Sequence, residues 1–213
     1  MRRTLIIINC ILMMVAMWVG LIYGQVNTIP LNMLYSHVPS SITALLCFVV
    51  LLVASIAYLK TSNPKWDNLA YASAEVGTVF AAILNITGSI FSRSEWGMWW
   101  TPSPRLVTAA ILLFLYIVYL ILRNSIPGSK HKRARVCAVF GIIAFLDVPM
   151  VLISARFIKN DMHIGNVSLD TNAQRLAFGL SILATLLLAG LLIWLRVDIN
   201  KCNSQLEKQL SLE

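Results

Sequence analysis

Residues Leu106–Leu122 read LVTAAILLFLYIVYLIL, an apolar run without one charged side chain. A helix needs about 17–25 mostly apolar residues to cross the hydrocarbon core of a bilayer. Backbone N–H and C=O groups find no water in that core, and a helix pairs all of them within one segment. The run therefore predicts a transmembrane helix, and the rest of the chain can be compared with it.

Five more stretches show the same pattern. The six predicted spans are Leu5–Tyr23, Ser41–Leu59, Leu69–Phe91, Leu106–Leu122, Ala134–Ile153 and Leu176–Leu195. The composition agrees with them, since 58% of the residues are hydrophobic, 12% are charged and the mean hydropathy is +0.77. Soluble domains carry about 25% charged residues. We expect an all-α, polytopic membrane bundle of six transmembrane helices over residues 1–198, and a short cytoplasmic tail at 199–213.

Basic residues are distributed unevenly between alternate segments of this predicted topology. Lys and Arg number twelve in the set that contains both termini and five in the other set. Cytoplasmic loops carry the excess of these residues, so the pattern predicts that both termini are cytoplasmic. Membrane orientation then explains the net charge of +8, and no nucleic-acid partner is expected. The predicted outer loops are 24–40, 92–105 and 156–175.

Motifs of soluble redox and nucleotide chemistry are missing from the sequence. It contains no glycine loop of the P-loop type and no Cys-x-x-Cys pair. Hydrolysis of ATP by the P-loop route and thioredoxin-like redox chemistry are therefore unsupported. An ATPase, if the protein uses one, must be a different chain.

The second outer loop, SRSEWGMWWTPSPR at residues 92–105, concentrates aromatic side chains. One interpretation is an interfacial aromatic belt, where tryptophan is common. The other is a shelf, shaped by prolines that fix the backbone, which would suit a planar apolar ligand with carboxylate groups. The candidate ligand-binding residues of the loop are Arg93, Trp96, Gly97, Trp99, Trp100 and Arg105.

Two histidines are predicted on the same face as this loop: His37 in Tyr-Ser-His-Val-Pro-Ser and His163 in Asp-Met-His-Ile-Gly. A single interfacial histidine is usually a hydrogen-bonding surface residue. Two histidines from separate loops permit axial ligation of a metalloporphyrin iron through neutral imidazole nitrogens, although spacing alone does not establish it. His131 lies among lysines and arginines in an inner loop and is expected to be a solvated residue.

Two acidic residues, Glu75 and Asp147, fall within predicted spans, where such residues are rare and suggest a function. Glu75 belongs to a polar or small helical face. The other members of that face are Tyr71, Thr78, Ala82, Asn85 and Ser89. The face predicts either a proton or ligand path or hydrogen bonds between helices. Asp147 precedes Val148-Pro149 and is either functional or a partner for backbone groups that the proline leaves unpaired.

Together these motifs resemble the cytochrome c maturation protein C family, also called haem exporter protein C, of the WWD haem-handling superfamily. The segments that carry the resemblance are Tyr35–Pro39, Ala74–Gly77, Thr87–Ser89, Trp96–Trp100, Arg105–Leu106, Leu113–Tyr116, Asp147–Pro149 and His163. The resemblance covers residues 35–195, and it is the combination of motifs that makes it specific.

The resemblance implies a non-enzymatic haem-transport subunit of cytochrome c biogenesis in a bacterial inner membrane. His37 and His163 would be axial ligands of a non-covalently held haem b at the periplasmic face, with the tryptophan loop as its platform. The haem would pass to a periplasmic haem chaperone, and ABC-type partner subunits would include a separate ATPase. One alternative is a permease-type subunit of an ABC complex with the tryptophan loop as a lipid anchor. Another is a haem-attaching synthetase of the same superfamily.

The chain departs from the family pattern at two places. The family loop usually runs Trp-Gly-Thr-Trp-Trp-x-Trp-Asp-x-Arg, whereas Pro102 and Ser103 stand where Trp and Asp are expected. Before the second histidine the family often has a Trp-Trp pair, and this chain has Phe157-Ile158. The aromatic platform is therefore expected to be thinner. Haem binding is expected to persist, and the changes bear on delivery to the chaperone.

Overall fold

The computed structural model describes residues 2–22, 33–157 and 169–210. Within these ranges every regular element is a helix, and six spans are long and apolar enough to cross a membrane. The helices are α1 (Arg2–Ile22), α3 (Leu34–Thr61), α4 (Pro64–Trp96), α5 (Pro104–Ser125), α6 (Lys130–Ala144), α7 (Asp147–Phe157) and α8 (Asn172–Leu210). The predicted all-α class and the number of spans are confirmed.

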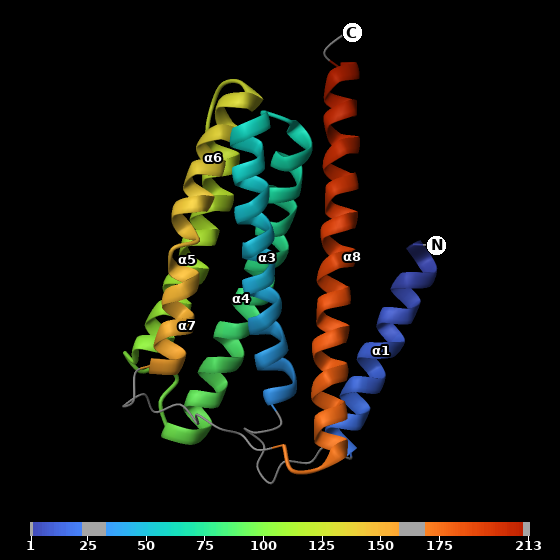
Figure 1. The fold of residues 1–213 in the computed structure, drawn as a ribbon, viewed down its shortest axis with the longest axis vertical. Helices are drawn as coiled ribbons and strands as arrows, with labels where there is room; N and C mark the ends of the chain where they lie inside the picture. The colour runs from blue at the N-terminus through green and yellow to red at the C-terminus, as the bar shows by residue number, and fades with distance from the viewer. Residues whose placement is uncertain (1, 23–32, 158–168, 211–213) are drawn as a thin grey trace.

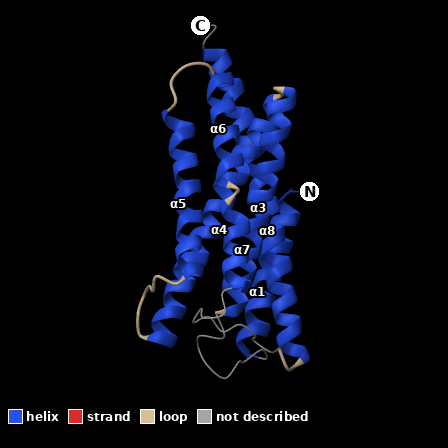
Figure 2. Ribbon diagram, turned by 60° about the vertical axis from the view of Figure 1, so that its left-hand side comes forward, coloured by secondary structure: helices blue, strands red, loops and turns tan. Residues whose placement is uncertain are grey.

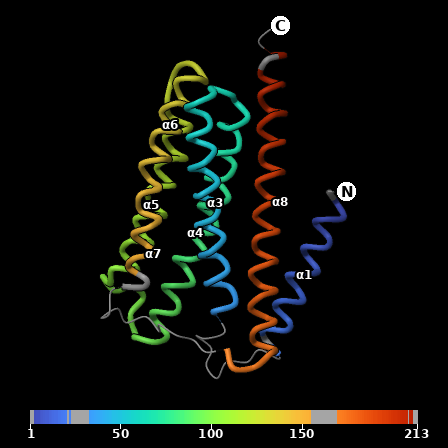
Figure 3. The backbone as a smooth tube through the Cα atoms, in the orientation of Figure 1, coloured from blue at the N-terminus to red at the C-terminus, as the bar shows by residue number. Residues whose placement is uncertain are grey.

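The six spans run alternately up and down along one axis, with α6 and α7 together forming the fifth (Figure 1). At the lower end in this view α3 begins, α4 ends at Trp96 and α5 begins at Pro104; we call it the tryptophan end. The opposite end, with the connections at residues 62–63 and 126–129, is called the basic end. The backbone trace shows α1 running toward the tryptophan end and α8 running away from it (Figure 3). α1 therefore begins, and α8 ends, away from the tryptophan end.

Several helices begin at side chains that cap them. The side chains of Asn63, Ser103 and Ser129 accept hydrogen bonds from backbone N–H groups at the starts of α4, α5 and α6. Such caps satisfy donors that have no partner within the helix. Pro64 and Pro104 follow two of the caps, at the first helical position, where the missing N–H is not needed. These residues fix where the helices turn back into the bundle.

The core lies where α3, α4, α5 and α6 meet. Phe48 stacks on Tyr116 with ring centroids 3.5 Å apart. A Cβ added at Gly77 would lie 2.6 Å from the Phe48 ring, and one added at Gly141 would lie 2.7 Å from Leu51. Small residues at helix contacts let the backbones approach closely, which is how membrane helices associate without a hydrophobic driving force between them.

The fifth span is interrupted near its middle, and Figure 2 shows the break as a short loop between α6 and α7. Pro149 lacks the N–H that would donate to the Phe145 oxygen in a continuous helix. The Val148 N–H donates to that oxygen instead, at 3.0 Å. Asp147 begins α7, and its Oδ2 is buried without a hydrogen-bond partner in the described structure. The expected pairing with freed backbone groups is therefore not seen at this oxygen.

The start of α3 lies earlier than predicted. The predicted span began at Ser41 and left His37 in a loop, but the helix begins at Leu34 and includes His37. Pro39 and Ser40 are buried within the bundle. Tertiary packing thus extends the helix through a proline and polar residues that would otherwise indicate its boundary.

Two other helices also run further than predicted. α4 continues to Trp96, which shortens the tryptophan loop to residues 97–103. α8 continues through residue 198 to Leu210 as one helix. The described part of the predicted tail, residues 199–210, is therefore a mostly exposed continuation of the last span.

α1 lies at the edge of the bundle. It packs mainly against α8, which in turn contacts α3 and α4. Near the tryptophan end, a Cβ added at Gly20 would lie 3.4 Å from the Tyr35 ring. Most side chains of α1 are exposed and apolar, as expected for a helix that faces lipid.

Candidate functional site

Hydrogen bonds to the last turn of α4 hold the start of the tryptophan loop in place. Gly97 ends α4 with φ +74°, in the left-handed region that glycine adopts without strain. Its N–H donates to the Arg93 oxygen at 3.1 Å. The buried Ser92 hydroxyl donates to the Met98 oxygen at 2.7 Å. The turn after α4 is therefore fixed before the chain reaches Trp99.

The three tryptophans of this loop have different surroundings. Trp96 is half-buried and meets Phe91 edge to face, with centroids 5.7 Å apart and an interplanar angle of 82°. Trp99 and Trp100 are 62% and 50% exposed. Trp96 thus anchors the end of α4, while the other two indoles are displayed at the surface.

The two arginines at the ends of the loop also differ. The Arg93 guanidinium donates to the Gly97 carbonyl, so the side chain folds over the turn that it precedes. Arg105 lies half-buried in the first turn of α5. The two cations thus come from the end of α4 and the start of α5, before and after the displayed indoles in the sequence.

Ser103, one of the residues that depart from the family pattern, is the N-cap of α5. Its hydroxyl accepts from the Leu106 N–H at 3.4 Å, and Pro104 follows at the first helical position. Asp and Ser are both good N-caps, so a serine retains the capping function that an aspartate would have there. Pro102 is exposed and presents no aromatic face, in keeping with the expectation of a thinner platform.

His37 lies in the first turns of α3 and contacts α4. Its Nδ1 is 2.8 Å from Thr87 Oγ1, in a part-buried contact. A Cβ added at Gly88 would lie 3.4 Å from His37 Cε1. The imidazole is thus seated on Thr87-Gly88 of α4, at the tryptophan end of the bundle.

The second predicted ligand, His163, lies outside the described residues, so no contact of this histidine can be given. α7 ends at Phe157 and α8 begins at Asn172, and both of these helix ends lie at the tryptophan end (Figure 1). The ligand pair and the platform remain predictions, although His37 and the tryptophan loop are at the same end of the bundle.

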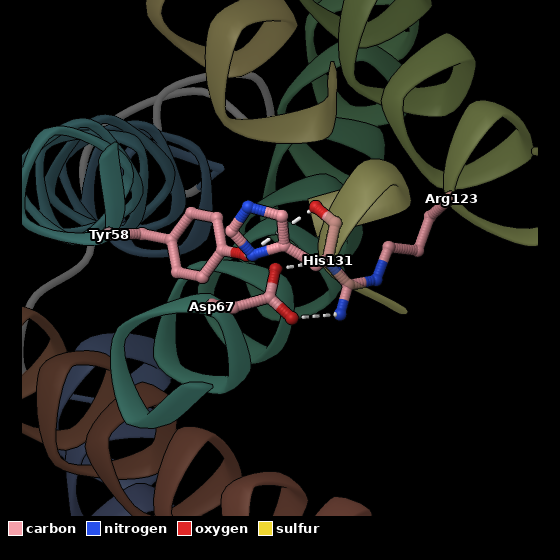
Figure 4. A network of polar contacts seen from close by, with 4 residues as sticks. All are labelled: Tyr58, Asp67, Arg123 and His131. Carbon is pink, nitrogen blue, oxygen red and sulfur yellow. Dashed lines mark hydrogen bonds and ion pairs between the residues drawn. The ribbon is translucent and has the colours of Figure 1, made fainter. Parts of the chain in front are cut away.

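The basic end carries a separate polar network, in which α3, α4, α5 and α6 each contribute one side chain (Figure 4). Arg123 Nη2 donates to Asp67 Oδ2 at 2.6 Å, and its Nη1 pairs with Oδ1. The Tyr58 hydroxyl lies 3.1 Å from His131 Nδ1. His131 is therefore not simply a solvated loop residue; it lies in the first turn of α6 and contacts α3.

Glu75 forms a two-pronged ion pair with Arg196 of α8. Arg196 Nε donates to Oε2 at 2.5 Å and Nη2 donates to Oε1 at 2.6 Å. The Tyr71 ring lies between this pair and the Asp67–Arg123 pair, with the Arg123 and Arg196 guanidinium carbons 4.7 and 5.8 Å from its centroid. The contact supports the interpretation of Glu75 as a link between helices.

The sequence did not indicate the partners of these residues. Thr87 belongs to a motif of the resemblance, but nothing in the sequence connected it with His37, which lies 50 positions earlier. In the sequence Arg196 counts only among the basic residues that indicate orientation. Asp67, Tyr71 and Glu75, at four-residue spacing, form one polar stripe on α4. That stripe could have suggested basic partners on neighbouring helices.

Comparison with known proteins bears on the whole chain. A family model described as heme exporter protein C matches residues 1–209. Heme exporter protein C of Escherichia coli (strain K12) is 29% identical over 179 residues, which cover 82% of this chain and 71% of that protein. Heme exporter protein C of Paracoccus denitrificans (strain Pd 1222) is 32% identical over 128 residues, which cover 59% of this chain and 52% of that protein.

A more distant relative is a ccmC-like mitochondrial protein of Marchantia polymorpha, named for cytochrome c biosynthesis. It is 25% identical over 132 residues, which cover 62% of this chain and 54% of that protein. The family match spans nearly the whole chain, includes the described helices except for the last residue of α8, and confirms the resemblance seen in the motifs. The chain therefore belongs to the heme exporter protein C family.

Proposed function

We propose that the chain is a haem-handling subunit of cytochrome c biogenesis that holds haem at the outer face of a bacterial inner membrane. Membership of the heme exporter protein C family supports this role. The excess of Lys and Arg in the segments at the basic end supports an orientation with both termini in the cytoplasm. In that orientation the tryptophan end faces the periplasm.

The observation that carries the proposal is the seat of His37 at the same end as the exposed indoles of Trp99 and Trp100. A neutral imidazole can bind haem iron, and indole faces can cover an apolar porphyrin. Haem is the cargo here, held non-covalently as haem b. The axial nitrogen and the aromatic surface would then come from two different segments.

The remaining predicted residues complete this assignment. His163 would supply the second axial nitrogen. Arg93 and Arg105 would pair with the haem propionates by charge-assisted hydrogen bonds. Trp96 and Gly97 fix the loop that displays the other indoles. The protein then acts by binding and orienting its cargo rather than as an enzyme.

The depth of His37 fits a cargo that is held before it is released. Thr87, which contacts the imidazole, lies nine residues before Trp96 on α4, or about 13 Å along the helix axis. The iron ligand is thus set deeper in the bundle than the exposed indoles. A haem whose outer edge lies at the surface would suit transfer to a periplasmic haem chaperone. ABC-type partner subunits, including a separate ATPase, would complete the complex.

The test uses the full-length protein, purified with its haem. His37→Ala and His163→Ala should each lower the haem content or change the spin state of the iron. Two axial imidazoles make the iron low-spin, and each substitution removes one of them. Added imidazole should partly restore the spectrum. His131→Ala is the matched control, since this histidine lies at the basic end.

One result would reject the ligand assignment: a haem content and spectrum unchanged in both outer variants. The chain would then be better described as a permease-type subunit whose tryptophan loop anchors it in lipid. Loss of haem in His131→Ala as well would point to a general defect in folding rather than to ligation.

A further inference from the structure

The contact between His37 and Thr87 has a defined direction. Thr87 Oγ1 lies 2.7 Å from the Ile83 carbonyl oxygen and 2.8 Å from His37 Nδ1. A hydroxyl has one hydrogen to donate and lone pairs to accept with. A carbonyl oxygen has no hydrogen, so the short contact with Ile83 requires that the threonine hydrogen points there. This is also the usual bond of threonine in a helix.

The hydrogen in the second contact must then come from the histidine. With its own hydrogen on Ile83, Thr87 Oγ1 can only accept, and Nδ1 of the neutral imidazole has to carry a proton. In a neutral imidazole only one nitrogen is protonated. The other nitrogen, Nε2, therefore holds the lone pair that can bind a metal.

We propose that Thr87 is a positioning residue for haem capture, which holds His37 in the Nδ1-H tautomer and orients its ring for iron binding through Nε2. The inference rests on the proposed function. Metal-binding histidines commonly donate their other N–H to an oxygen acceptor, which fixes the tautomer and strengthens the ligand. Here the acceptor is a threonine hydroxyl that is fixed by its own helix.

The surroundings of the ring support this role. The backbone N–H of His37 donates to the backbone oxygen of Met33 at 2.8 Å, which fixes the backbone that carries the ring. A Cβ at Gly88 would meet Cε1 at 3.4 Å, and the same point lies 4.0 Å from Leu106 Cδ2 of α5. The imidazole is thus held at its backbone by Met33 and at Nδ1 by Thr87, and its Cε1 edge packs close to Gly88.

The first measurement needs no substitution at Thr87. Full-length protein labelled with ¹⁵N-histidine is studied without haem at pH 8 in lipid nanodiscs, where the ¹⁵N chemical shifts distinguish protonated from unprotonated ring nitrogens. His131→Ala and His163→Ala assign the His37 signals. The proposal expects the Nδ1-H tautomer. A predominant Nε2-H tautomer would overturn it, whatever the variants do.

The second measurement compares three variants on α4. Thr87→Val removes the acceptor at nearly constant volume, and it should shift the tautomer, alter the haem spectrum and weaken haem affinity by about 10–100-fold, as is typical for such outer partners. Thr87→Ser keeps the hydroxyl and should behave like the unmodified protein. Thr78→Val is the matched control, because Thr78 makes the same 2.7 Å bond to a backbone carbonyl but has no hydrogen bond to a histidine among the described residues.

The outcomes separate this inference from the proposed function. If His37→Ala loses haem while Thr87→Val keeps the tautomer, spectrum and affinity, His37 is a ligand and Thr87 does not position it. If His37→Ala also has no effect on haem, the proposed ligand itself is wrong. If Thr87→Val fails to accumulate, Thr87→Ser and the tautomer of the unmodified protein still decide the matter.

Discussion

At the scale of single residues, the neighbouring tryptophans of the loop differ in burial and in their contacts. Trp96 packs on Phe91 and stabilises the end of α4, whereas Trp99 and Trp100 lie exposed beyond the glycine that ends the helix. The motif is one aromatic cluster in the sequence. In the structure Gly97 separates it into a packed tryptophan before the turn and two exposed tryptophans after it.

This division predicts opposite effects of alanine substitutions. Trp99→Ala and Trp100→Ala should lower haem content without lowering thermal stability, because both side chains are exposed. Trp96→Ala should lower the free energy of unfolding by about 1 kcal/mol through loss of the edge-to-face pair. Haem absorbance and thermal unfolding of the purified variants measure the two effects. Full haem content in both exposed-tryptophan variants would favour a lipid-anchor role for the loop.

At the scale of the helices, the sequence predicted the spans better than their ends. Runs such as Leu106–Leu122 contain enough apolar residues to indicate a crossing without any tertiary information. The beginning of α3 was misjudged because Pro39 normally indicates a boundary, and only packing shows that it lies inside the helix. The break at Pro149 could have been expected from the missing N–H alone.

The contacts between helices could not be predicted in the same way. Glu75 and Arg196 lie 121 positions apart, and helical periodicity shows which face a residue occupies but not which helix lies opposite. The same holds for His37 and Thr87. The sequence therefore indicated candidate residues for both ends of the bundle and left their pairings to the structure.

The Glu75–Arg196 pair is expected to stabilise the packing of α4 against α8. Glu75→Gln and Arg196→Gln should each lower the unfolding temperature, and the double variant should lose less than their sum, with a coupling energy of about 1 kcal/mol for a half-exposed pair. Lys130→Gln and Glu207→Gln provide the control, since that pair is 60% and 64% exposed and should show no measurable coupling.

The same variants test the other interpretation of Glu75. Its pairing with α8 predicts that haem content per folded protein stays unchanged in Glu75→Gln. A variant of normal abundance and stability that no longer supports cytochrome c maturation would instead show that Glu75 belongs to a functional path.

At the scale of the whole molecule, the bundle separates two chemistries along its axis. The imidazole seat and the exposed indoles lie toward one end, and the Asp67–Arg123 pair lies at the other (Figures 1 and 4). The Glu75–Arg196 pair lies eight residues beyond Asp67 along α4. The helices between them are packed through small residues such as Gly77 and Gly141. Asp67 and Thr87 lie twenty residues apart on α4, or about 30 Å along the helix axis, which is about the thickness of the hydrocarbon core.

The orientation of this axis is testable with reporters that are active only outside the cytoplasm. A fusion after Pro102 should be active, because the tryptophan loop is expected in the periplasm, and a fusion near Lys130 should be silent. Enzyme activity of each fusion, normalised to its abundance, gives the answer. The reverse pattern would place the indoles and His37 in the cytoplasm and end the proposed periplasmic role.

The packing of α1 against α8 also sets an order of events during synthesis. α1 is made before the other described helices but has its extensive contacts with α8, whereas α3 and α4 follow each other closely and can associate as a hairpin as soon as both are made. A nascent chain that ends before Asn172 holds α1 in the bilayer without its native neighbour. The contact that seats α1 on the bundle can therefore form only after α8 has been made.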